Sequence, residues 1–470
     1  MQALTQNYEE NVALMDAALR VEESFDILKK TLRAADGELT LYYIDGFIKD
    51  TVMQKLMMHF LSLKTLGDSA EAFVRDSVPY VEADAVDGGE TVDHLIAMVL
   101  SGAAVALGSP FGTGAVVIDA RTYPARSTAE PQDDRVMRGA RDGFVETLIF
   151  NTALLRRRVR STALTVRYLA VGTVSRTDIA VCFMADRADL DYVDKLCARL
   201  KSLRTESLTL GHQSLAECLI RTRWYNPFPK IRTTERPDAA TAQLLEGSVL
   251  IMVDNTPEVM ILPTSIFDML QETNDYYFPP LTGTYMRLVR HTVFWLTLFL
   301  TPTWYLLVRN PALLPSALTF ILPKEPAAIP LLAQLLLVEF LIDGLRLASM
   351  NTPDMLSNSL SVVSGLILGD FAVTAGWLMP EVILYMAFVA IANFSQRNYE
   401  LGYAFKFLRV ALLILTGLFN LAGYAAGVVL LILLLATNKT ANGKRGYLYP
   451  LIPFHGKALL GMFVRRRKKD

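Results

Sequence analysis

The sequence predicts a soluble α/β half made of two subdomains, followed by an all-α membrane domain of about five to six membrane segments. Three observations support this fold class. Residues 1–285 have the composition of an ordinary soluble protein, and helix-like and strand-like patterns alternate through them. A polar, proline-bearing spacer at 122–134 divides that region. From residue 291 onward, long apolar runs carry few charges. We therefore predict domains at 1–134, 135–285 and 286–470.

The bulk composition excludes several classes of function. The 470-residue chain has a net charge of −1, so it shows no basic footprint for a nucleic-acid partner. Its three cysteines and five histidines are scattered without the spacing of a metal or redox site, so no metal and no cofactor is expected. The N-terminus is acidic and amphipathic, unlike a secretory signal, so the soluble half is expected in the cytosol.

The first subdomain is predicted from local patterns. Helical spacing predicts helices at 11–20, 24–33, 49–63 and 93–102. Strands are predicted at 38–48, with a break at Asp45-Gly46, and at 114–122. The glycines at 108, 112 and 114 are not followed by the Lys-Ser/Thr pair of a phosphate-binding loop, so they predict a tight turn.

The second subdomain repeats this alternation. A helix at 143–161 ends in Arg156, Arg157, Arg158 and Arg160, which suits the helix dipole or, alternatively, contact with lipid headgroups or a neighbouring subunit. A strand at 176–185, a helix at 189–203 and a strand pair around the turn at 255–257 follow. No acids, bases or nucleophiles are grouped at a spacing that specifies catalysis, so we do not expect an enzyme.

The membrane half contains four predicted spans, at 291–308, 329–349, 357–378 and 380–394. The last apolar stretch, 408–436, fits either one long tilted span or a hairpin that bends near 420–423. The basic tail at 465–469 favours two passes, because basic residues concentrate on the cytosolic side. We therefore favour six segments, with a re-entrant hairpin as the alternative, and we expect the C-terminal tail in the cytosol.

The second span carries Glu339, Asp343 and Arg346 on one narrow helix face. Charges inside a membrane are costly and usually face protein or a water-filled path. One interpretation is a set of ion pairs that fixes this helix to its neighbours. The other is an ion path, in which a ring of subunits turns one carboxylate into a cation-selective ring. We predict that Glu339 faces the path without a partner and that Asp343 pairs with Arg346.

The third span offers a second candidate for the ion path. Its face mixes small polar and apolar side chains at Asn358, Ser361, Leu368 and Ala372, and Gly365 and Gly369 lie four residues apart. Such a face suits either a narrow hydrophobic gate or close helix packing. Because small residues gain nothing from packing against lipid, they predict that the chain forms a closed ring through its membrane half.

Several stretches resemble one protein family. Residues 141–158, 226–238, 244–263 and 334–349 resemble the A subunits of spore germinant receptors, the GerA family, and the similarity runs from about residue 42 to the C-terminus. Residues 226–238 and 376–385, with the short ending at 447–469, are most like one sporulation branch of that family. Asp370, a further candidate for the ion path or polar stripe, departs from the family pattern, because many relatives are expected to have a neutral residue there.

The resemblance implies a multi-pass protein of the spore inner membrane that acts in germination. Family members are expected to assemble as homo-oligomers in the form of pentamers, to conduct monovalent cations, and to work with other germination proteins of that membrane. The branch implied here amplifies the germination response. The alternatives are a nutrient-sensing A subunit and a membrane-anchored signalling or scaffold protein that has no pore of its own.

Overall fold

The computed structural model divides the chain into two compact units, each described here by itself. The first comprises Met1–Arg221 and Ile231–Pro263, and the second comprises Thr222–Lys230 and Thr264–Asp470. The structure describes residues 3–34, 37–78, 81–86, 92–122, 136, 138–220, 224–324, 328–351, 371–396, 398–443 and 446–465. A soluble half with two sheets is thus followed by a helical region, as the sequence predicts.

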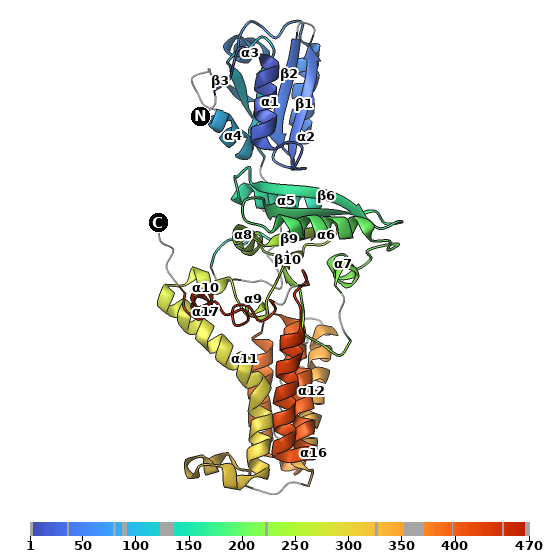
Figure 1. The fold of residues 1–470 in the computed structure, drawn as a ribbon, viewed down its shortest axis with the longest axis vertical. Coiled ribbons are helices and arrows are strands. Elements are labelled where there is room, and N and C mark those ends of the chain that lie inside the picture. Colours follow the sequence, from blue (N-terminus) through green and yellow to red (C-terminus); the bar gives the residue numbers. More distant parts are fainter. Residues whose placement is uncertain are drawn as a thin grey trace. The chain divides into compact units, whose positions relative to one another are not determined.

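The first subdomain is a five-stranded antiparallel sheet in the order β1-β2-β4-β5-β3. Helices α1 and α4 pack on one face, and α2 and α3 pack on the other (Figure 1). Its elements in chain order are α1 (Tyr8–Leu19), β1 (Ile27–Ala34), β2 (Gly37–Ile44), α2 (Asp50–Ser62), α3 (Ala70–Ser77), β3 (Glu82–Val86), α4 (Val92–Leu100), β4 (Ala104–Gly108) and β5 (Ala115–Asp119).

The helix predicted at 24–33 is wrong, because this segment is strand β1. Ile27 and Leu32 are buried, while Lys29, Lys30 and Thr31 between them are exposed. Residue by residue, β1 pairs with β2 from Ile27–Ile44 to Ala34–Gly37. The apolar spacing resembles a helical turn, but pairing along the neighbouring strand decides the conformation, since strand preference depends strongly on such partners.

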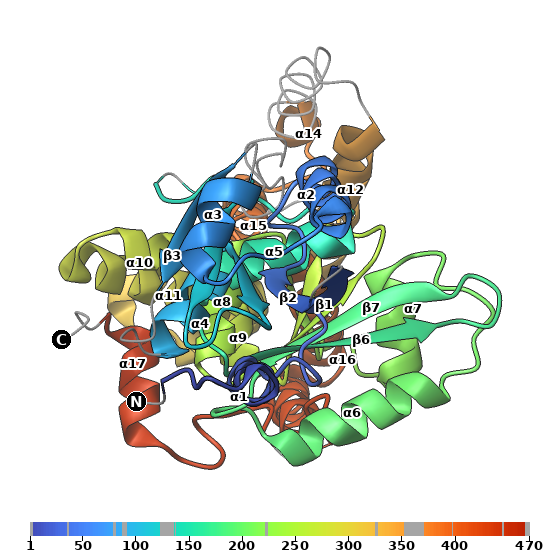
Figure 2. The same ribbon diagram turned by 90° about the horizontal axis from the view of Figure 1, so that it is seen from above.

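The second subdomain has the same plan. Its antiparallel sheet has the order β6-β7-β9-β10-β8, and Figure 2 shows α6 running alongside the long β6–β7 hairpin. Its elements in chain order are α5 (Leu148–Arg158), β6 (Leu164–Val171), β7 (Thr177–Met184), α6 (Leu190–Ser202), α7 (His212–Leu219), β8 (Arg232–Thr234), α8 (Pro237–Leu245), β9 (Val249–Val253) and β10 (Val259–Leu262).

The two subdomains are therefore copies of one fold. Both follow the order helix, two strands, two helices, strand, helix, two strands, and both sheets have the same strand order. The hairpins define equivalent positions, because Ile27 pairs with Ile44 as Leu164 pairs with Met184. The following helices, α2 and α6, each contain 13 residues. Side-chain environments can thus be compared between the copies position by position.

A buried ion pair joins the two copies. The Arg156 guanidinium in α5 donates to both carboxylate oxygens of Asp26, at 2.6 and 2.9 Å, and both side chains are at most 1% exposed. Arg156 also donates to the carbonyl oxygens of Ser161 and Leu164 and to the Ser24 hydroxyl. The Arg156 side chain therefore neutralises a buried carboxylate inside the protein and does not face lipid or a neighbouring subunit.

The second unit is helical throughout the residues that the structure describes. In chain order its elements are α9 (Ile266–Met269), α10 (Asn274–Tyr277), α11 (Pro280–Arg309), η1 (Pro311–Leu313), η2 (Ser316–Ile321), α12 (Leu331–Asn351), α14 (Ala372–Thr374), α15 (Pro380–Phe394), α16 (Tyr399–Thr437) and α17 (Gly456–Phe463). Helices α11, α12, α15 and α16 pack together, and buried side chains from all four form one apolar core (Figure 1).

This unit begins earlier than the hydropathy of the sequence suggests. The segment from Thr264 packs on the helical core rather than on the sheets, because Ile266, Phe267 and Leu270 join Phe294 and Phe405 in one buried cluster. Arg290 in α11 binds Glu272 and Asp275 at 2.9 and 2.6 Å, which fixes the entry into α11.

The long helix α16 folds back on itself at Asn420. Asn420 has a φ of 53° and a ψ of −131°, which interrupts the helix. Two glycines allow the two arms of this bend to approach closely. A Cβ at Gly423 would clash with the backbone of Leu415, and a Cβ at Gly427 would clash with the Leu412 side chain. Residues 399–419 and 421–437 are therefore antiparallel arms, as the hairpin interpretation of 408–436 predicts.

The number of membrane crossings remains a prediction. Among the described residues, Pro280–Arg309 and Tyr399–Thr437 have the length and hydropathy of a membrane span, and Pro380–Phe394 is a shorter apolar helix. Helix α12 is 21 residues long but carries three charged side chains. Most of the predicted third span, 357–370, lies outside the described residues.

Candidate functional site

The candidate site is built around helix α12, whose first turn is tied to α15. The Gln334 amide donates to the carbonyl oxygen of Ile329 at 2.7 Å, and its Oε1 accepts the backbone N–H of Met379 at 2.9 Å. Gln334 is fully buried. It therefore fixes the height and rotation of α12 at one end, and so decides which neighbours the charged residues about one to three turns later will meet.

Glu339 is the centre of the site. Its side chain is 4% exposed, and its two oxygens accept from Nε and Nη2 of Arg409 at 2.5 and 2.9 Å. Arg409, on α16, also donates through Nη1 to the carbonyl oxygen of Thr297 on α11, at 2.7 Å. A bidentate, charge-assisted pair of this kind is among the strongest polar contacts in proteins. One arginine thus joins α11, α12 and α16.

Lys406 extends the site by one turn. It lies three residues before Arg409 on α16, so both side chains project from the same face. Its Nζ donates to the carbonyl oxygen of Glu339 at 3.2 Å, lies 3.7 Å from Glu339 Oε2, and forms an ion pair with Asp343. Two carboxylates and two cations therefore balance one another inside an otherwise apolar helical region.

Arg346 lies apart from this network. Its guanidinium carbon is 4.7 Å from the ring centre of Tyr399, 4.9 Å from that of Tyr403 and 5.7 Å from that of Phe394. Aromatic faces attract cations at such distances. Arg346 therefore holds α12 to the junction between α15 and α16 through three rings.

Two sequence-based predictions about these charges are wrong. Glu339 does not stand without a partner, since Arg409 binds it, and Asp343 pairs with Lys406 rather than with Arg346. Spacing along one helix identified neighbours on that helix, whereas the actual partners come from α16, about 70 residues later. The signal in the sequence that could have found them is the basic pair Lys406 and Arg409 at the start of an apolar stretch.

The remaining predicted positions are not placed. Asn358, Ser361, Leu368 and Asp370 lie outside the described residues, so their assignment to an ion path stays a prediction. Within the described part of the chain, no three His, Cys, Asp or Glu side chains are grouped in a way that could hold a metal ion.

A second polar cluster closes the far end of the bundle. The Asn310 and Asn420 amides exchange hydrogen bonds at 2.6 and 2.9 Å, and Arg309 donates to the carbonyl oxygens of Thr416 and Gly417. Thr303 and Tyr424 also bond through their hydroxyls at 2.7 Å. The α16 bend is thus held against the end of α11 by side chains on both arms.

A short segment between α7 and β8 belongs to the helical unit. Asn226 donates to the carbonyl oxygen of Leu434, and the Tyr447 hydroxyl donates to the carbonyl oxygen of Pro229 at 2.8 Å. Phe228 is 2% exposed and packs edge-on against Phe405. This segment is part of 226–238, one of the stretches on which the family resemblance depends, and its role is to contact the end of α16.

The arrangement can act as a structural frame whose charged network reaches the surface of the helical unit at Asp343. Glu339 and Arg409 are buried, whereas the Asp343 side chain is 35% exposed. The network therefore leads from the centre of the helical unit toward its surface. Removing one member of the network would leave an uncompensated charge in a low-dielectric site, which is strongly destabilising. The geometry of the network is therefore strongly constrained.

Comparison with known proteins gives one consistent result. The family described as Bacillus/Clostridium GerA spore germination protein matches residues 16–470. The chain is 38% identical to stage V sporulation protein AF of Bacillus subtilis (strain 168), over 95% of this chain and 90% of that protein. It is 28% identical to spore germination protein A1 of the same organism, over 94% of this chain and 89% of that protein.

A solved structure of a receptor domain also matches this chain. It is the crystal structure of the N-terminal domain of the A subunit of the Bacillus megaterium spore germinant receptor GerK3. The TM-score is 0.42 and the identity 22%, and the match covers 55% of this chain and 96% of that one.

Proposed function

Since the chain belongs to the GerA family of spore germination proteins, we propose that it is a subunit of an oligomeric cation channel in the spore inner membrane. The family resemblance is confirmed, and the chain is 38% identical to stage V sporulation protein AF. In this proposal five copies form a ring, the soluble half faces the cytosol, and five or six segments cross the membrane. The channel releases monovalent cations and amplifies the germination response.

The observation that carries this proposal is the buried charge network of the helical unit. A helical anchor needs only apolar surface, yet this unit retains Glu339, Arg409 and Lys406 at no more than 5% exposure each. The network fixes α11, α12 and α16 as a frame. In the proposal that frame supports the third span, and Asn358, Ser361 and Leu368 of that span line the path. Asp370 is a further candidate residue of that path.

Cation flux through the full chain in liposomes tests the proposal. We expect potassium or sodium release, with block by a thiol-reactive cation in a Ser361→Cys variant. Ser349→Cys is the matched control, because Ser349 is exposed on α12 outside the proposed path. Flux without block at Cys-substituted position 361 would contradict the pore lining, and absence of flux would favour a scaffold role.

The alternative with specific support is a nutrient-sensing A subunit. The 28% identity to spore germination protein A1 extends over nearly the whole chain. The two functions differ in what starts the flux: a sensing subunit requires a nutrient, whereas an amplifier responds after germination has begun. Potassium release recorded from spores with and without the gene, under a stimulus that bypasses nutrients, separates them.

A further inference from the structure

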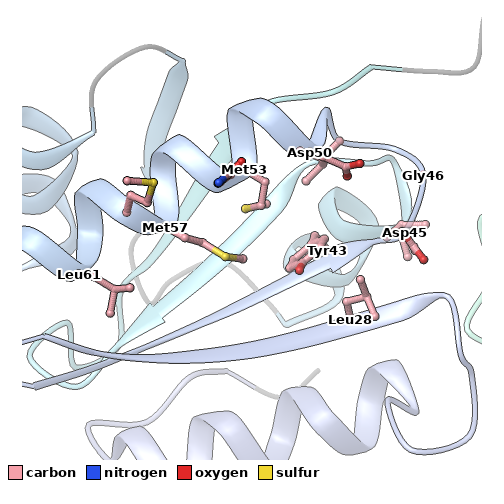
Figure 3. A pocket seen from close by; sticks show the side chains of 12 residues that line it. Leu28, Tyr43, Asp45, Gly46, Asp50, Met53, Met57 and Leu61 are labelled. Carbon is pink, nitrogen blue, oxygen red and sulfur yellow. The ribbon is translucent and has the colours of Figure 1, made fainter.

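A pocket of about 340 Å³ opens between the β1–β2 hairpin and helix α2 of the first subdomain (Figure 3). Its walls are apolar, with Leu28 from β1 and Met53, Met57 and Leu61 from α2. Figure 3 shows the methionine side chains along α2 and the loop containing Gly46 at the other end. Pockets of this size accommodate small molecules, and methionine walls adapt to different aliphatic shapes.

Acidic groups mark one end of this pocket. Asp45 and Asp50 both line it, beside the Tyr43 ring. Burial, with the nearby charges of Asp50 and Asp26, raises the pKa of the Asp45 carboxyl, and burial with Asp45 raises the pKa of Tyr43. Within the described chain, neither carboxylate forms an ion pair. The end of the pocket thus has the potential that attracts a cation.

The sister subdomain shows how the same groove is filled there. The Arg167 guanidinium lies 5.1 Å above the Phe183 ring and donates to Asp194 at 2.6 Å. It also approaches the Cys197 sulfur at 4.0 Å. An aliphatic stem with a cationic end therefore occupies the space between the hairpin and the helix in the second copy.

Equivalent positions in the first copy leave that space open. The pairing register and the matching helices make Tyr43, Gln54 and Met57 equivalent to Phe183, Asp194 and Cys197. Tyr43, Gln54 and Met57 all line the pocket. Lys30 is equivalent to Arg167, but its side chain is exposed and does not line the pocket. The first copy keeps the aromatic floor and apolar helix wall without the arginine, whose side chain is 38% exposed in the second copy.

We propose that this pocket binds a small organic cation with an aliphatic chain, an alkylguanidinium or alkylammonium. The chain lies along Met53, Met57 and Leu61, as the Arg167 stem lies in the sister groove. The cationic group rests over the Tyr43 ring and toward Asp45 and Asp50. This binding site lies in the soluble unit and does not depend on the chain being a channel.

Methionine methyl NMR of the full chain in lipid nanodiscs tests the site with n-butylguanidinium as the probe. We expect saturable shifts of Met53 and Met57, with Met386 of α15 unchanged as a control for partition into lipid. Pentan-1-ol supplies the chain without charge, and guanidinium supplies charge without chain. Each should bind at least tenfold more weakly than n-butylguanidinium. Equal binding of pentan-1-ol, or no saturable shift, would overturn the proposal.

Three variants test the contacts. Lys30→Arg/Gln54→Asp transplants the sister arrangement, so the new arginine should fill the groove and weaken probe binding at least tenfold. Asp45→Asn/Asp50→Asn should weaken it similarly by removing the charge. Asp93→Asn removes an exposed acid from the same subdomain and should bind like the wild type. Wild-type binding by both double variants, with their methionine spectra otherwise preserved, would refute the assignment.

Discussion

The buried ion pairs of the two units are similar at their centre and different at their edges. In both, an arginine that is at most 2% exposed makes a bidentate contact with a buried carboxylate far away in the sequence. Around Arg156 the remaining donors end on carbonyl oxygens and a serine hydroxyl, so the cluster is closed. Around Arg409 the cluster continues through Lys406 to Asp343, which is partly exposed. The cluster around Arg156 only holds the two subdomains together. The cluster around Arg409 connects the interior of the helical unit with its surface.

The largest effect is expected in the closed cluster. Arg156→Leu leaves the Asp26 carboxylate buried without a cation, which typically costs about 3–5 kcal/mol. We expect loss of hydrogen-exchange protection in β1 and β6 of the full chain. The control Asp26→Leu/Arg156→Met removes both charges at similar volume and should restore most of the protection. A double variant as unprotected as the single one would contradict the ion-pair explanation.

A smaller loss is expected in the open cluster. Arg409→Leu also strands a buried carboxylate, but Lys406 Nζ remains 3.7 Å from Glu339 and offsets part of the cost. We expect destabilisation of about 3 kcal/mol, at the lower end for broken buried pairs, and reduced accumulation in membranes. Glu339→Gln/Arg409→Leu should accumulate better. If Arg409→Leu proves more damaging than Arg156→Leu, Lys406 does not compensate and the two clusters are not different in kind.

Removing the outlying cation should have a still smaller effect. Arg346→Leu loses its contacts with three aromatic rings but strands no acid, so we expect about 1–2 kcal/mol and near-normal accumulation. A double-mutant cycle with Tyr403→Leu should show coupling, because the two side chains are in contact. Complete loss of accumulation would mean that Arg346 neutralises an acid after all.

The smallest effect concerns Asp45, which forms no ion pair among the described residues. The folded-state pKa of Asp45 is raised, so its contribution to stability is present below the usual carboxyl value of about 3.9 and is lost as pH rises through the folded value. Asp45→Asn should therefore raise the thermal midpoint slightly at pH 7 and leave it unchanged at pH 3.5. Thermal unfolding followed by circular dichroism at both values checks this. A lower midpoint at pH 7 would show that the Asp45 charge is stabilised by the fold.

Local sequence patterns predicted most of the long helices and several strands. They failed where pairing between strands decides the conformation of a segment. The segments that became α2, α4, α6, β7 and the β9–β10 pair were predicted, because their apolar periodicity is clear. Strand β1 was predicted as a helix, since Leu28 and Leu32 lie four positions apart, as on one face of a helix. The sequence patterns also did not reveal that the two sheets share one strand order. The order of strands in a sheet depends on contacts between strands that are distant in the sequence.

The sequence by itself determined the division into a soluble and a helical half, the family and the three charged positions of α12, and it favoured the α16 bend over one long helix. These follow from hydropathy, residue type and local spacing, which act over a few turns. Only the tertiary structure decided that Glu339 binds Arg409, that Asp343 binds Lys406 and that Arg167 fills a groove its sister subdomain leaves open. The reason is physical: a charge is neutralised by whichever group the packing of whole helices and sheets brings within about 4 Å, and that distance is not encoded in local spacing.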